Sequence, residues 1–118
     1  MTNRFQFTVP IYNVVIKVFK DYRESLTSMF NQATGMNREN ILYPMELAKT
    51  IQVSTEEEGS YIVLLLTENY NTSILVHEAV HMAKATMRIS GIKQPDEETE
   101  AFITQYCFSA IDSYLNHK

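Results

Sequence analysis

The sequence predicts an α+β fold, a small β-sheet with packed helices, in the element order β-α-β-β-α-α. Three observations lead to this class: alternating apolar and polar residues near the N-terminus, a short apolar run in the middle, and two long helical patterns near the C-terminus. The chain has 118 residues, which suits one domain with a modest core and is too short for two. We therefore expect residues 1–118 to form a single domain.

The N-terminal part predicts one strand followed by one helix. Residues 5–19 are expected to form a strand interrupted at Pro10, because apolar side chains alternate along much of this segment. Residues 21–34 have apolar side chains at helical spacing, and Gly35 is a suitable stop for that helix. The segment from there to Pro44 is rich in turn-forming residues and predicts a loop.

The remaining part predicts a β-hairpin and two helices. Residues 49–54 and 60–67 are expected to be the two strands of the hairpin, joined through a Glu-rich turn. The second strand is almost continuously apolar, so we expect it to be buried on both faces. One helix is expected over 71–90, and another after Pro95 as far as about Asn116, with acidic residues in its first turns that favour the helix dipole.

Composition and charge limit the classes of partner. The net charge is −4 and the sequence has no basic cluster, so we expect neither a nucleic-acid surface nor an anionic-membrane surface. No apolar stretch is long enough to span a membrane, and the N-terminus does not have the apolar core of a signal peptide. Cys107 is the single cysteine, which fits a reducing compartment, and we therefore expect a cytoplasmic protein.

The clearest chemical signal is the segment His77-Glu78-Ala79-Val80-His81, an HExxH motif. On a helix, His77 and His81 lie one turn apart on the same side, so both imidazole rings can bind a single Zn²⁺ ion. Glu78 lies beside them, where its carboxylate can act as a general base toward a zinc-bound water molecule. The motif therefore predicts a zinc site with Glu78 as its catalytic residue.

A catalytic zinc site needs a third protein ligand, and the last predicted helix is its expected source. On a helical wheel, the two histidines are expected to point away from the sheet and toward this helix. The wheel places Glu100 near the centre of the helix's apolar stripe, Glu97 at the edge of the stripe, and Glu98 toward solvent. A carboxylate on a buried stripe is costly unless it is paired or metal-bound, so Glu100 is the expected ligand and Glu97 the second choice. The alternative explanation for Glu100 is an ion pair with Lys84 or Arg88.

This set of residues resembles the gluzincin metallopeptidases, the thermolysin-like zincins, in which a second helix carries a ligand Glu that is often followed by Ala. The matching residues here are His77, Glu78, His81, Glu100 and Ala101. The 19-residue gap from His81 to Glu100 is similar to that of the short-spaced members of the family. The resemblance covers roughly residue 49 to the C-terminus, and it implies a minimal zincin-like fold, a Zn²⁺ cofactor and hydrolysis of peptide bonds. Small proteins of this kind occur in prokaryotes and their phages.

Two features depart from the family pattern. Thermolysin-like enzymes commonly have an Asp one turn after the ligand Glu, where it orients the first histidine, and Thr104 occupies that position here. A hydroxyl tunes the basicity of a histidine less than a carboxylate does. The larger enzymes also place a Tyr or His from a further domain over the substrate oxyanion. Tyr70, Tyr106 and His117 are candidates for that role by their chemistry alone.

Three alternatives to a zinc peptidase stay open on the sequence. The first is a zincin-fold interaction or structural protein that binds metal without turnover, suggested by the small size and by Thr104. The second is a metal-dependent hydrolase of another substrate, although the sequence has no Gly-rich loop to hold a phosphate. The third is a chance motif with two solvated histidines. The expected partner of the peptidase is a peptide or protein substrate, and the sequence identifies no further protein partner.

Overall fold

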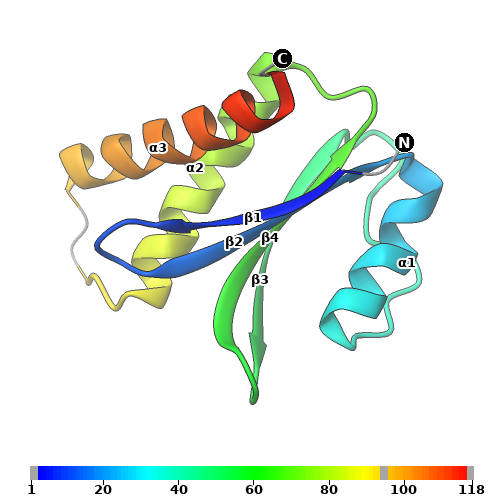
Figure 1. Cartoon of the computed structure of the whole chain (residues 1–118), viewed down its shortest axis with the longest axis horizontal. Helices are drawn as coiled ribbons and strands as arrows, with labels where there is room; N and C mark the ends of the chain where they lie inside the picture. The colour runs from blue at the N-terminus through cyan, green and yellow to red at the C-terminus, as the bar shows by residue number, and fades with distance from the viewer. Residues whose placement is uncertain (1–2, 94–95, 117–118) are drawn as a thin grey trace.

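The computed structural model describes residues 3–93 and 96–116, and it confirms the α+β class. Four strands form one mixed sheet in the order β1-β2-β4-β3, with helices on both of its faces (Figure 1). The strands are β1 (Asn3–Val9), β2 (Val14–Asp21), β3 (Ala48–Thr55) and β4 (Gly59–Thr67). The helices are α1 (Arg23–Thr34), α2 (Thr72–Ile89) and α3 (Glu97–Asn116).

The observed order, β-β-α-β-β-α-α, has one strand more than the sequence predicted. Residues 5–19 do not form one interrupted strand, because the chain reverses after Pro10 and β1 and β2 pair as an antiparallel hairpin. Proline has no amide N–H to donate to a sheet, and Asn13 in the turn adopts a positive φ of 55°, which asparagine tolerates better than most residues. The amide of Asn13 donates to the carbonyl of Val9 at 2.9 Å and closes the turn.

The centre of the sheet is the parallel pair of β2 and β4, in which Ile16 lies opposite Ile62. Every residue of β4 from Tyr61 to Thr67 is buried, which confirms the expected burial on both faces. The described sheet has β1 and β3 as its two edges, each antiparallel to its single neighbour. The outer edge of β3 is therefore open to pairing with a further strand.

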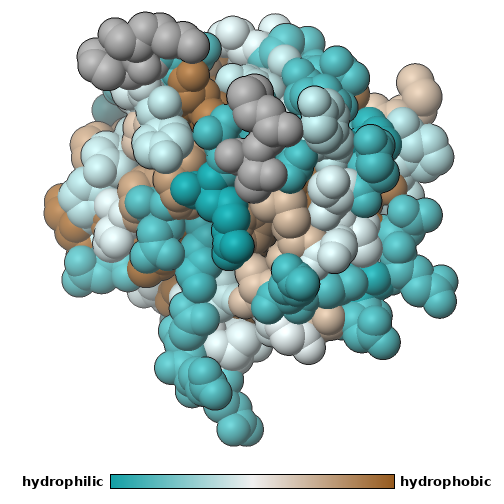
Figure 2. Space-filling model, turned by 45° about the vertical axis from the view of Figure 1, so that its right-hand side comes forward, coloured by the Kyte–Doolittle hydropathy of each residue, from teal (hydrophilic) through white to brown (hydrophobic). Residues whose placement is uncertain are grey.

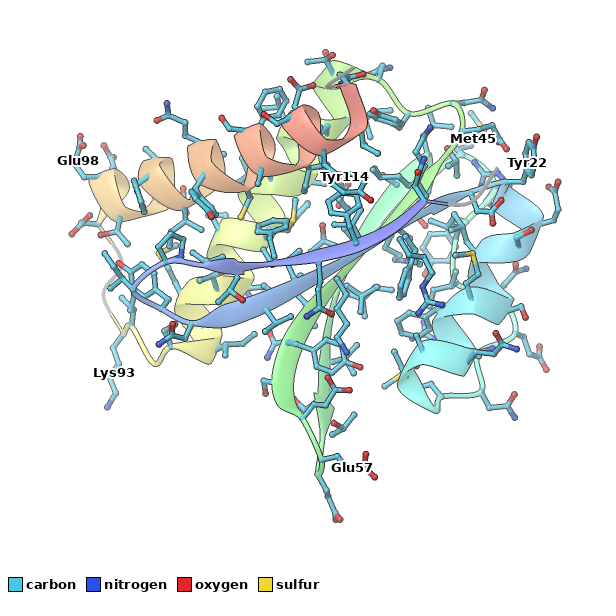
Figure 3. The ribbon with its side chains drawn as sticks, in the orientation of Figure 1. Tyr22, Met45, Glu57, Lys93, Glu98 and Tyr114 are labelled. Atoms are coloured by element: carbon cyan, nitrogen blue, oxygen red, sulfur yellow. The ribbon has the colours of Figure 1, made fainter. Side chains whose placement is uncertain are left out.

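Buried side chains form a separate core on each face of the sheet. On one face, Leu26 and Phe30 of α1 pack with β2 and β4. On the other face, α2 lies over β3 and β4, whereas α3 lies against α2 and β1 (Figure 1). Tyr114 of α3 stacks on Phe5 of β1 with ring centroids 3.7 Å apart, and Figure 3 shows its ring between the helix and the strand. This arrangement brings the HExxH helix next to the edge strand β3.

The surface seen in Figure 2 is mainly hydrophilic, with apolar residues in scattered patches. The tip of the hairpin between β3 and β4 projects at the lower edge of this view, where Glu56, Glu57 and Glu58 are exposed. Among the described residues, no helix is long and apolar enough to cross a membrane.

Candidate functional site

A capping residue sets where α2 begins, and an apolar face sets which side of the helix packs on the sheet. The side-chain oxygen of Asn71 accepts the amide of Ile74 at 2.9 Å, so the helix begins at Thr72. Its fully buried apolar side chains then face the sheet: Leu75, Ala79, Met82 and Ala83. Once this face is buried, helical geometry brings His77 and His81 to the flank of α2.

The two histidines of the motif present their ring nitrogens to each other. Both side chains are exposed, and the Nε2 atoms of His77 and His81 are 3.1 Å apart. Zinc bound tetrahedrally by two imidazoles, at roughly 2.0–2.1 Å from each nitrogen, separates those nitrogens by about 3.4 Å. The observed separation agrees with this value to within a few tenths of an ångström. The histidine pair therefore fits two of the positions around a zinc ion.

Glu78 lies beside the histidines but is buried, with 7% of its surface exposed. The hydroxyl of Thr50, on β3, donates to Oε1 of Glu78 at 2.7 Å. A buried carboxylate needs such a donor, because the loss of its hydration is otherwise uncompensated. The bond from Thr50 also fixes where the carboxylate points, which is toward the edge strand.

A cleft of about 260 Å³ lies between α2 and β3 and brings the three motif residues together. Its far wall contains Thr50 and Gln52 of β3, and Lys84 and Arg88 continue the α2 wall beyond the motif. The sequence-based expectation that the histidines face the last helix is wrong, because they line this cleft with β3 instead. A helical wheel gives the angles between side chains of one helix but not which neighbour lies on which flank.

Glu100, the expected third ligand, lies on the other side of α2. It lines a groove between α2 and α3 together with Val76, Val80 and Glu97. One carboxylate oxygen of Glu100 accepts from Nζ of Lys84 at 2.8 Å, which is the ion pair considered as the alternative on the sequence. Within residues 3–93 and 96–116, no three His, Cys, Asp or Glu side chains come together as a metal-binding group.

The neighbours of Glu100 on α3 have local roles. The hydroxyl of Thr104 donates to the backbone carbonyl of Glu100 at 2.8 Å, so it is bound within its own helix. Asp96 precedes α3, and its carboxylate accepts a hydrogen bond from the amide N–H of Thr99 at 2.6 Å. This hydrogen bond lowers the pKa of the Asp96 carboxyl. Glu98 points away from the body of the molecule, as expected (Figure 3).

The tyrosines considered for oxyanion stabilisation do not line the cleft. Tyr106 lies beside Phe7, with ring centroids 6.1 Å apart, on the α3 side of the molecule. Tyr70 packs against the core under α2 and α3, and burial raises the pKa of its hydroxyl. His117 lies outside the described residues. Cys107 is a packed thiol whose pKa burial raises to about 12.

The wall formed by β3 is the part of the site that the sequence reasoning missed. The types of residue at Thr50 and Gln52 carry no signal of their own, and only the strand order brings them opposite α2. Together with the motif they make a cleft that has a buried carboxylate, two paired imidazoles and an open strand edge. A comparison of the chain with protein-family models, with curated proteins and with solved structures found no match.

Proposed function

We propose that this protein is a zinc-dependent metallopeptidase in which His77, His81 and Glu100 hold the metal. The observation that carries the proposal is the pair of Nε2 atoms 3.1 Å apart, next to a buried carboxylate in a cleft. When bound there, zinc would polarise the substrate carbonyl and lower the pKa of a water molecule toward about 7. The remaining steps rest on side chains and backbone of this chain.

Glu78 is the proposed general base and acid. Thr50 occupies Oε1 of the carboxylate, so Oε2 is the oxygen that would accept a proton from the attacking water. The same oxygen would then deliver the proton to the nitrogen of the leaving amine.

The open edge of β3 is the proposed binding surface for the substrate. An extended peptide can pair with the edge strand as an added strand, and its main chain is then held beside the cleft. β3 is the strand expected over 49–54, and the order of the described sheet has it at an edge. Backbone pairing of this kind requires no particular substrate side chain, so selectivity must come from the residues around the cleft.

For this proposal to hold, Glu100 must leave Lys84, and its carboxylate must reach the side of α2 on which the histidines lie. In the described arrangement its carboxylate is bound by Lys84, and its side chain is 33% exposed. Partly exposed ion pairs contribute little to stability, on the order of 1 kcal/mol or less, so the loss of Lys84 as a partner is by itself a modest cost. Glu97, which lines the same groove, remains the second choice of ligand.

Metal content and peptide cleavage, measured together, test the proposal. We expect about one zinc per chain in the wild type, in Glu78→Gln and in the matched control Glu98→Ala, and loss of zinc in Glu100→Ala. Elemental mass spectrometry measures the metal, and cleavage of a mixed peptide library is followed by mass spectrometry. Cleavage should be lost in Glu78→Gln despite bound zinc. A wild type that stays empty after zinc addition, or a Glu78→Gln variant that still cleaves, would contradict the proposal.

A second candidate function is that of a zincin-like interaction or structural protein without turnover. Two observations favour it: Glu100 is paired with Lys84, and neither Tyr70 nor Tyr106 reaches the cleft. In that case no peptide of the library would be cut, and metal removal would lower the melting temperature of any zinc-bound form. Cleavage that disappears in Glu78→Gln would exclude this candidate.

We further propose that the protein acts in the cytoplasm on a peptide or protein substrate. The single cysteine is buried and forms no disulfide within the chain, which suits a reducing compartment. The net charge of −4 gives no support to a nucleic-acid or anionic-membrane partner. Fractionation of the cells that produce the protein would test its location.

A further inference from the structure

Arg88 differs from the two lysines of the cleft, Lys49 and Lys84, in having no described carboxylate opposite it. Lys84 is bound to Glu100 at 2.8 Å, and Lys49 is bound to Glu46 at 3.3 Å. In the described part of the chain, no carboxylate lies within ion-pair distance of Arg88. The guanidinium is therefore a cation of the cleft that no described ion pair neutralises, whereas the carboxylate of Glu78 in the same cleft is bound by the hydroxyl of Thr50.

The guanidinium of Arg88 is held toward the edge strand. Its Nε donates to the side-chain oxygen of Gln52 on β3 at 3.3 Å, which spans the cleft from α2 to β3. This bond uses one of the five N–H donors of the guanidinium, and among the described residues no hydrogen bond involves its two terminal nitrogens. These nitrogens form the planar fork that matches a carboxylate in a two-point contact.

The spacing along α2 relates Arg88 to the proposed site of cleavage. Arg88 follows His81 by seven residues, which is about 10 Å along a helix axis. An extended peptide covers that distance in about three residues. On β3 itself, Thr50 contacts Glu78 and Gln52 contacts Arg88, so the two contacts are two residues apart. A peptide paired with β3 beside the histidines would therefore pass Arg88 two or three residues from the bond that is cut.

We propose that Arg88 selects peptides carrying a carboxylate two or three residues from the cleaved bond, and this inference rests on the proposed peptidase function. The carboxylate is either an Asp or Glu side chain or the C-terminal group of the substrate, because the fork binds both in the same way. A simpler role for Arg88 is to complement the dipole at the end of α2, where it lies in the last turn. That role requires no bond across the cleft and predicts no preference among peptides.

Peptide binding to the zinc-supplemented Glu78→Gln variant tests the proposal without turnover. The probes are N-acetylated octapeptides in matched pairs, with Glu or Gln at each position in turn and with the C-terminus either amidated or free. We expect Glu to be favoured over Gln by about fivefold at one position when the C-terminus is amidated. A preference for free over amidated C-termini would identify the terminal carboxylate as the group bound.

Matched variants separate Arg88 from a general effect of charge. The preference should disappear in Glu78→Gln/Arg88→Gln and weaken in Glu78→Gln/Arg88→Lys, which keeps the charge but not the fork. It should survive in Glu78→Gln/Lys93→Gln, because Lys93 points away from the body of the molecule (Figure 3). Far-ultraviolet circular dichroism checks that each variant is folded.

Equal binding of acidic and neutral peptides, no binding of any peptide, or a preference that survives Arg88→Gln would overturn the inference. The zinc content of the same samples is measured separately. A zinc-loaded protein without carboxylate preference would contradict this inference alone. A zinc-free protein that still prefers acidic peptides through Arg88 would support this surface and contradict the proposed metal site.

Discussion

The two hollows on either side of α2 differ in chemistry although one helix walls both. The cleft toward β3 contains the buried carboxylate of Glu78, the paired histidines and Arg88. The groove toward α3 contains the apolar side chains of Val76, Val80 and Phe108 beside Glu97 and Glu100. Lys84 connects them, since it lines the cleft and its Nζ binds Glu100. The difference teaches that the motif brings two imidazoles together within one helix, whereas the partner of Glu100 depends on how α3 is placed beside α2.

The largest expected effect is on the rate at which a thiol reagent reaches the side of α3 that packs on α2. Cys107 is fully buried on the inner face of α3, so we expect a thiol reagent to react with it at least a hundredfold more slowly than with Ser109→Cys in a Cys107→Val background. Ser109 is exposed on the same helix and serves as the matched control. Similar reaction rates for the two thiols would mean that α3 opens readily. The groove toward α3 would then be no more closed to a reagent than the cleft toward β3.

The buried thiol also gives a dependence on pH. Its pKa in the folded protein is about 12, above the ordinary value of 9.0, because burial disfavours the thiolate. The contribution of the thiol to the free energy of unfolding is therefore complete below pH about 9 and falls as the pH rises toward 12. Denaturant titrations at several alkaline pH values should show a smaller loss of stability in Cys107→Val than in the wild type.

The next effect compares the same substitution on the two sides of α2. Thr50→Val removes the donor to the buried carboxylate of Glu78, and we expect the free energy of unfolding to fall by about 2 kcal/mol. Thr104→Val removes only a bond within α3, and we expect a change below about 0.5 kcal/mol. Urea denaturation measures both values. Equal losses would show that Thr50 has no special role in holding Glu78.

The smallest effect concerns the residue that connects the two hollows. Lys84→Met frees the carboxylate of Glu100 from its ion pair, and we expect zinc affinity to rise by about fivefold. Competition with a chelator of known affinity measures the change, and Lys93→Met provides a control of equal charge. An unchanged or weaker affinity would mean that Lys84 does not compete with the metal for Glu100.

Features that arise within one element were predictable from the sequence. The α2 helix was expected over 71–90 and is observed over Thr72–Ile89, because Asn71 is a strong cap and the apolar spacing is helical. The apolar run of β4 predicted burial on both faces, and every residue from Tyr61 to Thr67 is buried. In these cases short-range physical chemistry determines the outcome.

Features that depend on which elements become neighbours were not predictable. The alternating pattern continues on both sides of Pro10, so it could not distinguish one interrupted strand from a hairpin. The wall of the cleft depends on β3 being the edge next to α2, which no residue of β3 signals by itself. For Glu100, the wheel identified a carboxylate that needs a partner, but the choice between Lys84 and a metal depends on the distance between two helices.

The parallel pairing of β2 with β4 has a consequence for how the molecule assembles. The hairpins β1–β2 and β3–β4 each join strands that are close in the chain, whereas the pairing of Ile16 with Ile62 closes a long loop that contains α1 and β3. Contacts between distant parts of a chain form late, because the loss of chain entropy precedes the gain in contacts. We therefore expect the two hairpins to form first and the seam between them to be the step that limits the rate of folding.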